Sequence, residues 1–262
     1  MPAQPTSENS PKRNRKPGKE RLDVLLVSRG LAASREQAQA LLLAGEVRVN
    51  GATAGKAGSQ IAADARIELA GEGLRYASRG GLKLEGAIED FGTSLQDKVC
   101  LDIGSSTGGF TDCMLQHGAA KVYAVDVSTD QLRWNLRTDG RVVMVERNAR
   151  YLQAADIGEE VDFVTVDVSF ISVTKVLPAI APLARAGADF LILVKPQFEL
   201  EKRDIGKGGI VRDEALHRKA IDRVRAAAAE AGAGLHVEGE HPSRVKGAEG
   251  NQEYFLHARR LS

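Results

Sequence analysis

The apolar and polar positions along this chain change their spacing near residue 83. Beyond it, short apolar runs alternate with stretches whose apolar residues repeat at helical spacing. Seven runs are expected to be strands, at 99–103, 121–127, 142–145, 161–168, 189–194, 235–238 and 254–258. Helices are expected at 111–118, 130–140, 173–187 and 213–232. This alternation predicts an α/β fold with a mostly parallel seven-stranded sheet, which ends in an antiparallel pair because no helix separates the last two runs.

The pattern before residue 71 predicts a smaller α+β unit. Two apolar helical faces each end at a glycine, and the second follows a capping box formed by Ser34 and Gln37. Asn50-Gly51 then marks a tight hairpin turn, and residues 65–69 close the unit as a strand. We therefore divide the chain into a disordered basic tail at 1–19, an α+β domain at 20–70, a glycine-rich linker at 71–82 and an α/β domain at 83–262.

Charge is concentrated at the front of the chain. The net charge is +1 over 262 residues, yet Lys12 to Arg66 holds eleven Lys and Arg against five Asp and Glu. A basic end on a nearly neutral chain indicates a polyanionic partner that contacts this end.

Other compositional features exclude several classes of protein. No apolar run approaches the roughly 20 residues of a membrane span, and the first twenty residues contain no apolar stretch, so no membrane partner and no secretory signal are expected. The two cysteines, Cys100 and Cys113, lack metal-ligand spacing and are expected to be reduced core residues. These features predict a cytoplasmic protein without a metal site. No pattern specifies an oligomeric state.

The stretch "LDIGSSTGGF" is the first candidate binding site. It follows the first predicted strand and opens a helix, which is the position where doubly wound sheets bind their ligands. The Lys-Ser/Thr of a phosphate loop is absent, and the glycine spacing differs from a dinucleotide fingerprint. S-adenosylmethionine (SAM) is the third option, since Asp102 could accept a hydrogen bond from its amino group. The candidate cofactor-binding residues here are Asp102, Gly104, Ser105, Ser106, Thr107, Gly108, Gly109 and Phe110.

Polar residues also follow the next three predicted strands. Asp126 would accept hydrogen bonds from ribose hydroxyls, Asn148 would pair with the adenine edge, and Asp167 would lie beside the methionine end. Because the carboxyl ends of parallel strands share one edge of a sheet, these residues predict a SAM site there. An NAD-dependent reductase is the alternative on the same fold, but the chain lacks a Tyr-x-x-x-Lys pair or a similar hydride-site signature.

Lys195 follows the fifth predicted strand, and Asp167 is its natural partner at the same edge. Together with Lys83 and Glu253, these residues resemble the catalytic tetrad of FtsJ-type RNA 2′-O-methyltransferases. The resemblance implies a Rossmann-like SAM-dependent methyltransferase domain. In it, Lys195 would steer and deprotonate a ribose hydroxyl, while Asp167 would hold Lys195 and Lys83 and Glu253 would orient the ribose.

The front unit resembles the S4 RNA-binding domain, most specifically from "SREQA" to "AGEVRVNG". This resemblance implies that the second helix and the turn before it face RNA. The candidate RNA-binding residues are Arg29, Ser34, Arg35 and Gln37.

The two halves together resemble the TlyA family over about residues 20–261, through "SRGGLKL", "LDIGSSTGGFTD", "DVSFIS", "LVKPQFE", "KGGIVRD" and "GAEGNQEYFL". The resemblance implies transfer of a methyl group from SAM to cytidine 2′-hydroxyls of ribosomal RNA, with ribosomal RNA or a ribosomal subunit as partner. Shorter family members are thought to modify only the large subunit, and a chain that stops at Ser262 is expected to do so. Some members carry the name hemolysin, so a membrane-active protein is one alternative, and a non-catalytic protein that binds SAM and RNA is another.

Overall fold

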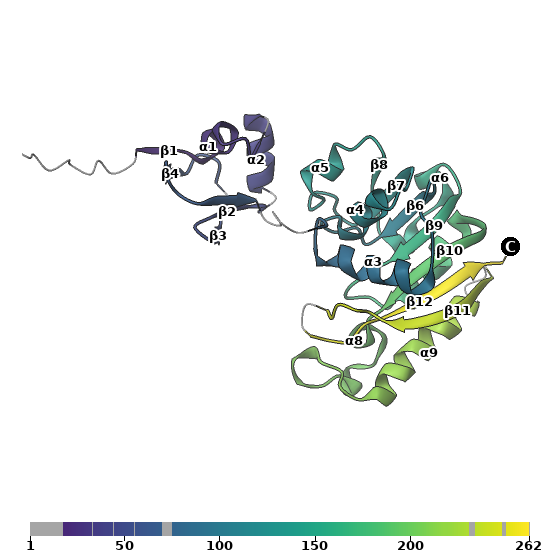
Figure 1. Ribbon diagram of the computed structural model, residues 1–262. Coiled ribbons are helices and arrows are strands. Elements are labelled where there is room, and N and C mark those ends of the chain that lie inside the picture. The colour runs from purple at the N-terminus through teal and green to yellow at the C-terminus, as the bar shows by residue number, and fades with distance from the viewer. Residues whose placement is uncertain are drawn as a thin grey trace, which may run out of the picture. The chain divides into compact units, whose positions relative to one another are not determined.

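The computed structural model describes residues 18–32, 34–43, 45–54, 56–69, 75–230, 234–247 and 250–261. The chain separates into two compact units, residues 1–70 and 71–262 (Figure 1). Within the described part of the chain, no helix is both long enough and apolar enough to cross a membrane.

The first unit contains the predicted helices and hairpin. Its elements are β1 (Lys19–Arg21), α1 (Leu22–Ser28), α2 (Arg35–Leu43), β2 (Val47–Val49), β3 (Ala52–Thr53), β4 (Gln60–Ala62) and β5 (Ile67–Leu69). The sheet order is β3-β2-β5, and β1 pairs separately with β4. Asn50 and Gly51 both have positive φ, at 51° and 85°, as the tight turn between β2 and β3 requires. β1 and β4 were not predicted.

The predicted disordered tail at 1–19 extends too far, because its last residue belongs to a strand. Lys19 lies in β1 and pairs with Ala62, while residues 1–17 lie outside the described residues.

The second unit is built on a seven-stranded sheet of order β11-β12-β10-β9-β6-β7-β8 (Figure 1). Its strands are β6 (Val99–Ile103), β7 (Lys121–Asp126), β8 (Val142–Glu146), β9 (Val161–Val166), β10 (Ala184–Val194), β11 (Leu235–Pro242) and β12 (Tyr254–Arg260). The five strands from β10 to β8 are mutually parallel, whereas β12 is antiparallel to both of its neighbours. The predicted fold class and the antiparallel end of the sheet are thus confirmed.

Helices cover both faces of this sheet. The α3 face carries α3 (Arg79–Phe91), α4 (Gly109–Gln116) and α5 (Trp134–Arg137), and the other face carries α6 (Ala154–Ile157), α7 (Leu177–Ile180) and α9 (Glu214–Glu230). Side chains alternate accordingly: Leu191 and Leu193 of β10 pack with the α3 face, and Phe190 and Ile192 with the opposite one. The remaining elements are η1 (Ala149–Tyr151), η2 (Val173–Lys175), η3 (Ala181–Leu183), α8 (Pro196–Glu199), η4 (Lys202–Asp204) and η5 (Lys207–Gly209).

Two boundaries differ from the prediction. The linker expected at 71–82 is too long, because Tyr76 and Ala77 are buried against the second unit and α3 begins at Arg79. The helix expected at 173–187 is divided into η2, α7 and η3, and β10 already begins at Ala184. Pro178 and Pro182 remove two backbone donors there, so a continuous helix cannot form.

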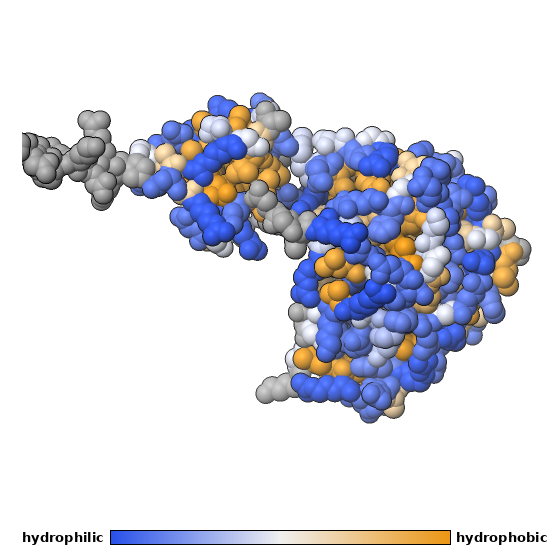
Figure 2. Space-filling view, viewed as in Figure 1, coloured by the Kyte–Doolittle hydropathy of each residue, from blue (hydrophilic) through white to orange (hydrophobic). Residues whose placement is uncertain are grey.

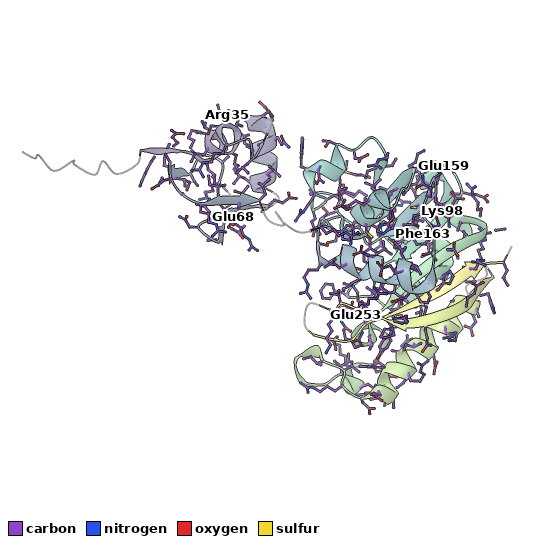
Figure 3. The ribbon with its side chains drawn as sticks, viewed as in Figure 1. Arg35, Glu68, Lys98, Glu159, Phe163 and Glu253 are labelled. Carbon is purple, nitrogen blue, oxygen red and sulfur yellow. The ribbon has the colours of Figure 1, made fainter. Side chains whose placement is uncertain are left out.

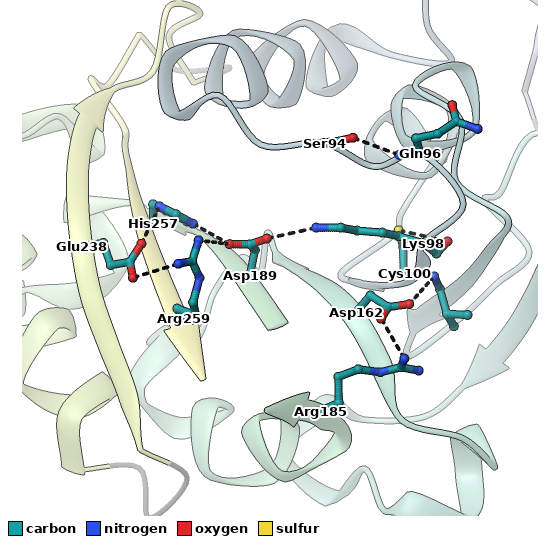
Figure 4. A network of polar contacts seen from close by, with 11 residues as sticks. Ser94, Gln96, Lys98, Cys100, Asp162, Arg185, Asp189, Glu238, His257 and Arg259 are labelled. Carbon is teal, nitrogen blue, oxygen red and sulfur yellow. Dashed lines mark hydrogen bonds and ion pairs between the residues drawn. The ribbon is translucent and has the colours of Figure 1, made fainter. Parts of the chain in front are cut away.

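A network of charged groups closes the amino edge of the sheet (Figure 4). Asp189 accepts hydrogen bonds from His257 at 3.0 Å, Lys98 at 3.0 Å and Arg259 at 3.2 Å. Burial opposes ionisation of Asp189, but these bonds outweigh it and hold the pKa of that carboxyl well below its usual range. Figure 2 shows hydrophilic side chains over most of the visible face of this unit.

Candidate active site at the carboxyl edge of the sheet

Strand register gathers the predicted tetrad at the opposite edge. Val194 pairs with Tyr254, so Lys195 and Glu253 occupy the next position beyond the ladder. Val166 pairs with Ile192, which places Asp167 just beyond the end of β9 beside them. Because Leu193 and Phe255 pack on the α3 face, the alternation of the pleat turns Lys195 and Glu253 to the same face. Figure 3 shows Glu253 at the beginning of β12.

The tetrad forms two buried ion pairs. Lys195 Nζ lies 2.5 Å from Asp167 Oδ1 and donates to Ser169 Oγ at 2.8 Å. Lys83 Nζ lies 2.5 Å from Glu253 Oε2, and their side chains are only 12% and 3% exposed. Buried charges of this kind are tolerated when paired, so each lysine is fixed in position by its own carboxylate.

Close packing of two helix starts positions Lys83. Ser78 caps α3 by accepting a hydrogen bond from the Gly80 N–H. A Cβ at Gly109, the first residue of α4, would collide with Ser78 Oγ, and a Cβ at Gly81 would collide with the Tyr76 side chain. The glycines of "SRGG" and "GGF" therefore let α3 and α4 approach each other, which brings Lys83 to the sheet edge.

The glycine turn after β6 is held tightly against β7 and β9. The N–H groups of Gly104 and Ser105 both donate to the Val125 carbonyl, at 2.9 and 3.1 Å. Gly104 has a φ of 87°, and a Cβ there would collide with the Asp167 carbonyl oxygen. The Ser106 N–H donates to Asp126 Oδ2 at 2.9 Å. Backbone rather than side chain thus forms this wall of the site.

A cavity of about 530 Å³ opens beside these strand ends. Its size falls within the range usual for pockets that hold drug-sized ligands. Five predicted site residues line it: Gly104, Ser106, Asp126, Asn148 and Asp167. The strands therefore bring together the residues proposed for the ribose, the adenine and the methionine end of SAM.

Other residues of the glycine turn do not line the cavity. Gly108 has a φ of 93°, and a Cβ there would collide with the Leu132 and Leu136 side chains. Phe110 is buried and stacks on Phe255 with ring centroids 6.2 Å apart. Ser105, Thr107 and Gly109 are likewise absent from the lining. Their contribution is to shape the turn and the start of α4.

Asp102 lies beneath the glycine turn. Its side chain is fully buried, and its two carboxylate oxygens accept hydrogen bonds from Thr111 at 2.6 Å and Thr165 at 3.0 Å. Burial raises its pKa to about 7 despite these bonds. Asp102 therefore joins β6, β9 and α4 and is not among the residues that line the cavity.

The sequence prediction missed an exposed aromatic side chain at this site. Phe170 lines the cavity, has a φ of 65° and is 93% exposed. Its ring lies 5.4 Å from that of Phe198. An exposed ring beside a catalytic centre can stack on a planar base. The only sequence signal was an aromatic residue three positions after Asp167.

Asn251 is a second residue that the sequence prediction missed. It is buried, accepts a hydrogen bond from the Val211 N–H and donates to the Gly209 carbonyl. His217 completes the arrangement through its contact with the Val211 carbonyl at 2.9 Å. The "KGGIVRD" and "GNQEYF" segments are thereby joined directly beside Glu253.

The predicted RNA-binding residues of the first unit have different surroundings. Arg29 donates to the carbonyls of Ala63 and Ala65, both at 2.6 Å, and the Ser34 hydroxyl accepts from the Gln37 N–H, so these groups also hold the fold together. Arg35 is exposed and ion-pairs with the buried Asp23 at 3.0 Å. Arg29 and Arg35 are therefore both exposed cations held in position, Arg29 by backbone carbonyls and Arg35 by a carboxylate.

Comparisons with known proteins agree with this geometry. The family model "FtsJ-like methyltransferase" matches residues 76–260, and the model "S4 domain" matches residues 20–67. Within the described ranges, no cluster of His, Cys, Asp and Glu could hold a metal ion.

Similar proteins cover both units. The "16S/23S rRNA (cytidine-2'-O)-methyltransferase TlyA" of Mycobacterium tuberculosis is 45% identical over 238 residues, 90% of this chain and 88% of its own. "Hemolysin A" of Brachyspira hyodysenteriae is 44% identical over 239 residues, 90% of this chain and 98% of its own. A solved structure, "Putative hemolysin from Streptococcus thermophilus", has a TM-score of 0.69 and 44% identity, and the match covers 94% of this chain and 90% of that one.

Proposed function

The chain belongs to the family of FtsJ-like methyltransferases that carry an S4 domain, as TlyA does, and on this premise we propose a specific reaction. It transfers a methyl group from SAM to the 2′-hydroxyl of a cytidine in ribosomal RNA, in the cytoplasm where ribosomes are assembled. The observation that carries the proposal is the Lys195–Asp167 ion pair, of which Asp167 lines the cavity beside Gly104.

The cavity fits SAM by the chemistry of its walls. Asp126 offers carboxylate oxygens to the ribose hydroxyls, and Asn148 offers an amide to the adenine edge. Asp167 gives the ammonium of the methionine end a carboxylate, and Gly104 leaves room for it. When bound, SAM supplies an electrophilic methyl group on a sulfonium. SAM contains no phosphate, which agrees with a glycine turn that lacks the Lys-Ser/Thr pair of a phosphate loop.

The two ion pairs have different roles toward the ribose hydroxyl: one would deprotonate it, and the other would orient the ribose. A ribose hydroxyl is a weak nucleophile and must approach in line with the departing sulfur. Once Lys195 has passed a proton to the Asp167 carboxylate, its Nζ would hydrogen-bond the hydroxyl and accept the hydroxyl proton. Lys83, held by Glu253, would orient the ribose from the α3 face. Correct alignment contributes part of the ~7–11 kcal/mol available from well-oriented reaction partners.

Mapping of ribose methylation tests this function directly. Ribosomal RNA from both subunits is incubated with SAM and the full-length protein, and ribose methylation is mapped by mass spectrometry. We expect a new 2′-O-methylcytidine in RNA of the large subunit. The sample with small-subunit RNA shows whether that subunit is modified too. Absence of methylation in both RNAs, from protein that binds SAM in calorimetry, would overturn the proposal. Leakage of liposomes without methylation would favour the membrane-active alternative.

RNA recognition by the first unit has its own test. Arg35→Gln should weaken RNA binding about three- to tenfold and lower the salt dependence by roughly one phosphate contact, because an oriented guanidinium is lost. Arg66→Gln is the matched control, since Arg66 is exposed and paired with Glu68 in the same unit. Equal binding by the wild type and Arg35→Gln would remove Arg35 from the interface.

A further inference from the structure

Two catalytic segments of the second unit are joined along their length. The segment 167–173 carries Asp167, Ser169 and Phe170, and the segment 195–199 carries Lys195. Lys195 contacts the first segment through Asp167 and Ser169, and Phe198 contacts it through the Phe170 ring. Glu199, which is not part of the tetrad, makes the last contact in this series.

Glu199 binds the far end of the 167–173 segment. Its side chain is almost completely buried, at 2% exposure. One oxygen accepts from the Ser172 hydroxyl at 2.5 Å and the other from the Val173 N–H at 2.8 Å. Arg223 of α9 donates to the Glu199 backbone carbonyl at 2.6 Å, which anchors α8 from the other side.

This carboxylate has no ion-pair partner within the described ranges. Burial raises the pKa of Glu199, so the ionised group is costly at this position. It does not line the cavity, and both of its oxygens accept hydrogen bonds from Ser172 and Val173. These bonds oppose the cost of burial, and they hold the segment that presents Asp167 and Ser169 to Lys195.

We propose that Glu199 is a positioning residue for methyl transfer, which acts through Ser172 and Val173 to keep Asp167 in contact with Lys195. The inference rests on the proposed function. Without Glu199, the 167–173 segment keeps its attachment to β9 but loses two hydrogen bonds at its other end. The position of the Asp167 carboxylate relative to Lys195 Nζ is then no longer fixed from both ends of the segment.

The direction of the hydrogen bonds distinguishes substitutions at this position. Ser172 donates to Glu199, so its oxygen is free to accept from Thr174, whose hydroxyl lies 2.7 Å away. In Glu199→Gln, the amide can donate to Ser172, which then donates to Thr174, while the amide oxygen still accepts from Val173. Glutamine therefore preserves both contacts, whereas leucine preserves the volume and neither contact.

The test compares full-length Glu199→Leu, Glu199→Gln and the wild type at saturating RNA and SAM. We expect kcat to fall about 10- to 100-fold in Glu199→Leu, as for a displacement of about 1 Å at a reacting group, and to stay within about threefold of wild type in Glu199→Gln. Glu201→Leu is the matched control, because it removes a carboxylate two residues away that is 62% exposed. It should behave as wild type.

A crystal structure of Glu199→Leu gives a readout that does not depend on activity. Separation of Lys195 Nζ and Asp167 Oδ1 beyond 4 Å is expected, and an unchanged contact would overturn the proposal. Equal loss of kcat in the glutamine and leucine variants would also overturn it. If leucine prevents folding, Ser172→Ala removes the same oxygen contact, with an expected three- to tenfold loss of kcat and the same separation. Failure of the wild type to methylate RNA would count against the function alone, since the crystallographic comparison still decides the role of Glu199.

Discussion

Each of the two edges of the central sheet carries a lysine–aspartate pair, and the two pairs have opposite surroundings. At the amino edge, Asp189 accepts from Lys98, His257 and Arg259 in one closed network (Figure 4). At the carboxyl edge, Asp167 contacts Lys195 and borders a cavity of about 530 Å³.

The difference separates a structural ion pair from the one that we propose to be catalytic. Asp189 accepts from three side chains and does not line the cavity, whereas Asp167 does line it. Of the pair at the carboxyl edge, Asp167 lines the cavity, and Lys195 contacts it there. Residue type alone does not reveal function, whereas the presence of reachable space beside a pair does.

The same substitution at both lysines should give the largest contrast. Lys195→Met should lower kcat/KM about 10³- to 10⁴-fold, because the hydroxyl loses the group that orients and deprotonates it. Lys98→Met should leave kcat/KM of the folded protein within about threefold and lower its stability instead. Methyl transfer to ribosomal RNA and urea unfolding measure the two effects. An active Lys195→Met variant would contradict the mechanism.

Opening the amino network should cost stability next. Asp189→Asn leaves Lys98, His257 and Arg259 without their common anion, and the expected loss is about 3–5 kcal/mol in unfolding free energy. Urea denaturation measures it, with the exposed Asp97→Asn as control. A loss below about 1 kcal/mol would show that the network is dispensable.

Asp102 lies at the carboxyl edge but resembles the amino edge, because its hydrogen bonds are internal. Its pKa is raised to about 7 in the fold, compared with about 3.9 in an unfolded chain, so the native state binds the proton more tightly. The stability contributed by this group is complete below about pH 4 and is lost as pH rises through 7. Relative to Asp102→Asn, the wild type should lose about 2–4 kcal/mol between pH 4 and 8 in urea titrations. A difference that stays constant with pH would contradict this.

The smallest effect should come from the most exposed group. Phe170→Ala should leave the unfolding free energy unchanged, since the ring is 93% exposed. If the ring stacks on the substrate, RNA binding should weaken by about 1–2 kcal/mol. Phe170→Trp, which keeps an aromatic face, should restore binding, and an equal loss in both variants would exclude stacking.

The sequence was sufficient for most of the fold and the site framework. Buried strands appear as apolar runs, and because parallel strands end at one edge, Asp126, Asn148 and Asp167 could be grouped before any coordinates. Resemblance to the FtsJ-type tetrad brought Lys83 and Glu253 into the same site, and the coordinates pair them at 2.5 Å.

Other features depended on contacts between distant segments. Thr111 and Thr165 satisfy Asp102 from different elements, and no local pattern encodes that saturation. Glu199 is an ordinary acidic residue in the sequence, and its function follows only from its contacts with Ser172 and Val173. The broken helix at 173–187 was predictable from its prolines but was obscured by a strong apolar period.

The strand order β11-β12-β10 has a consequence for biosynthesis. β10 and β11 are translated before β12, yet β12 must come to lie between them. A growing polypeptide therefore has an open gap in its sheet until the codons for β12 have been read and that segment has cleared the exit tunnel. Because Glu253 directly precedes β12, the nascent chain completes the tetrad only after both β10 and β11 have been translated.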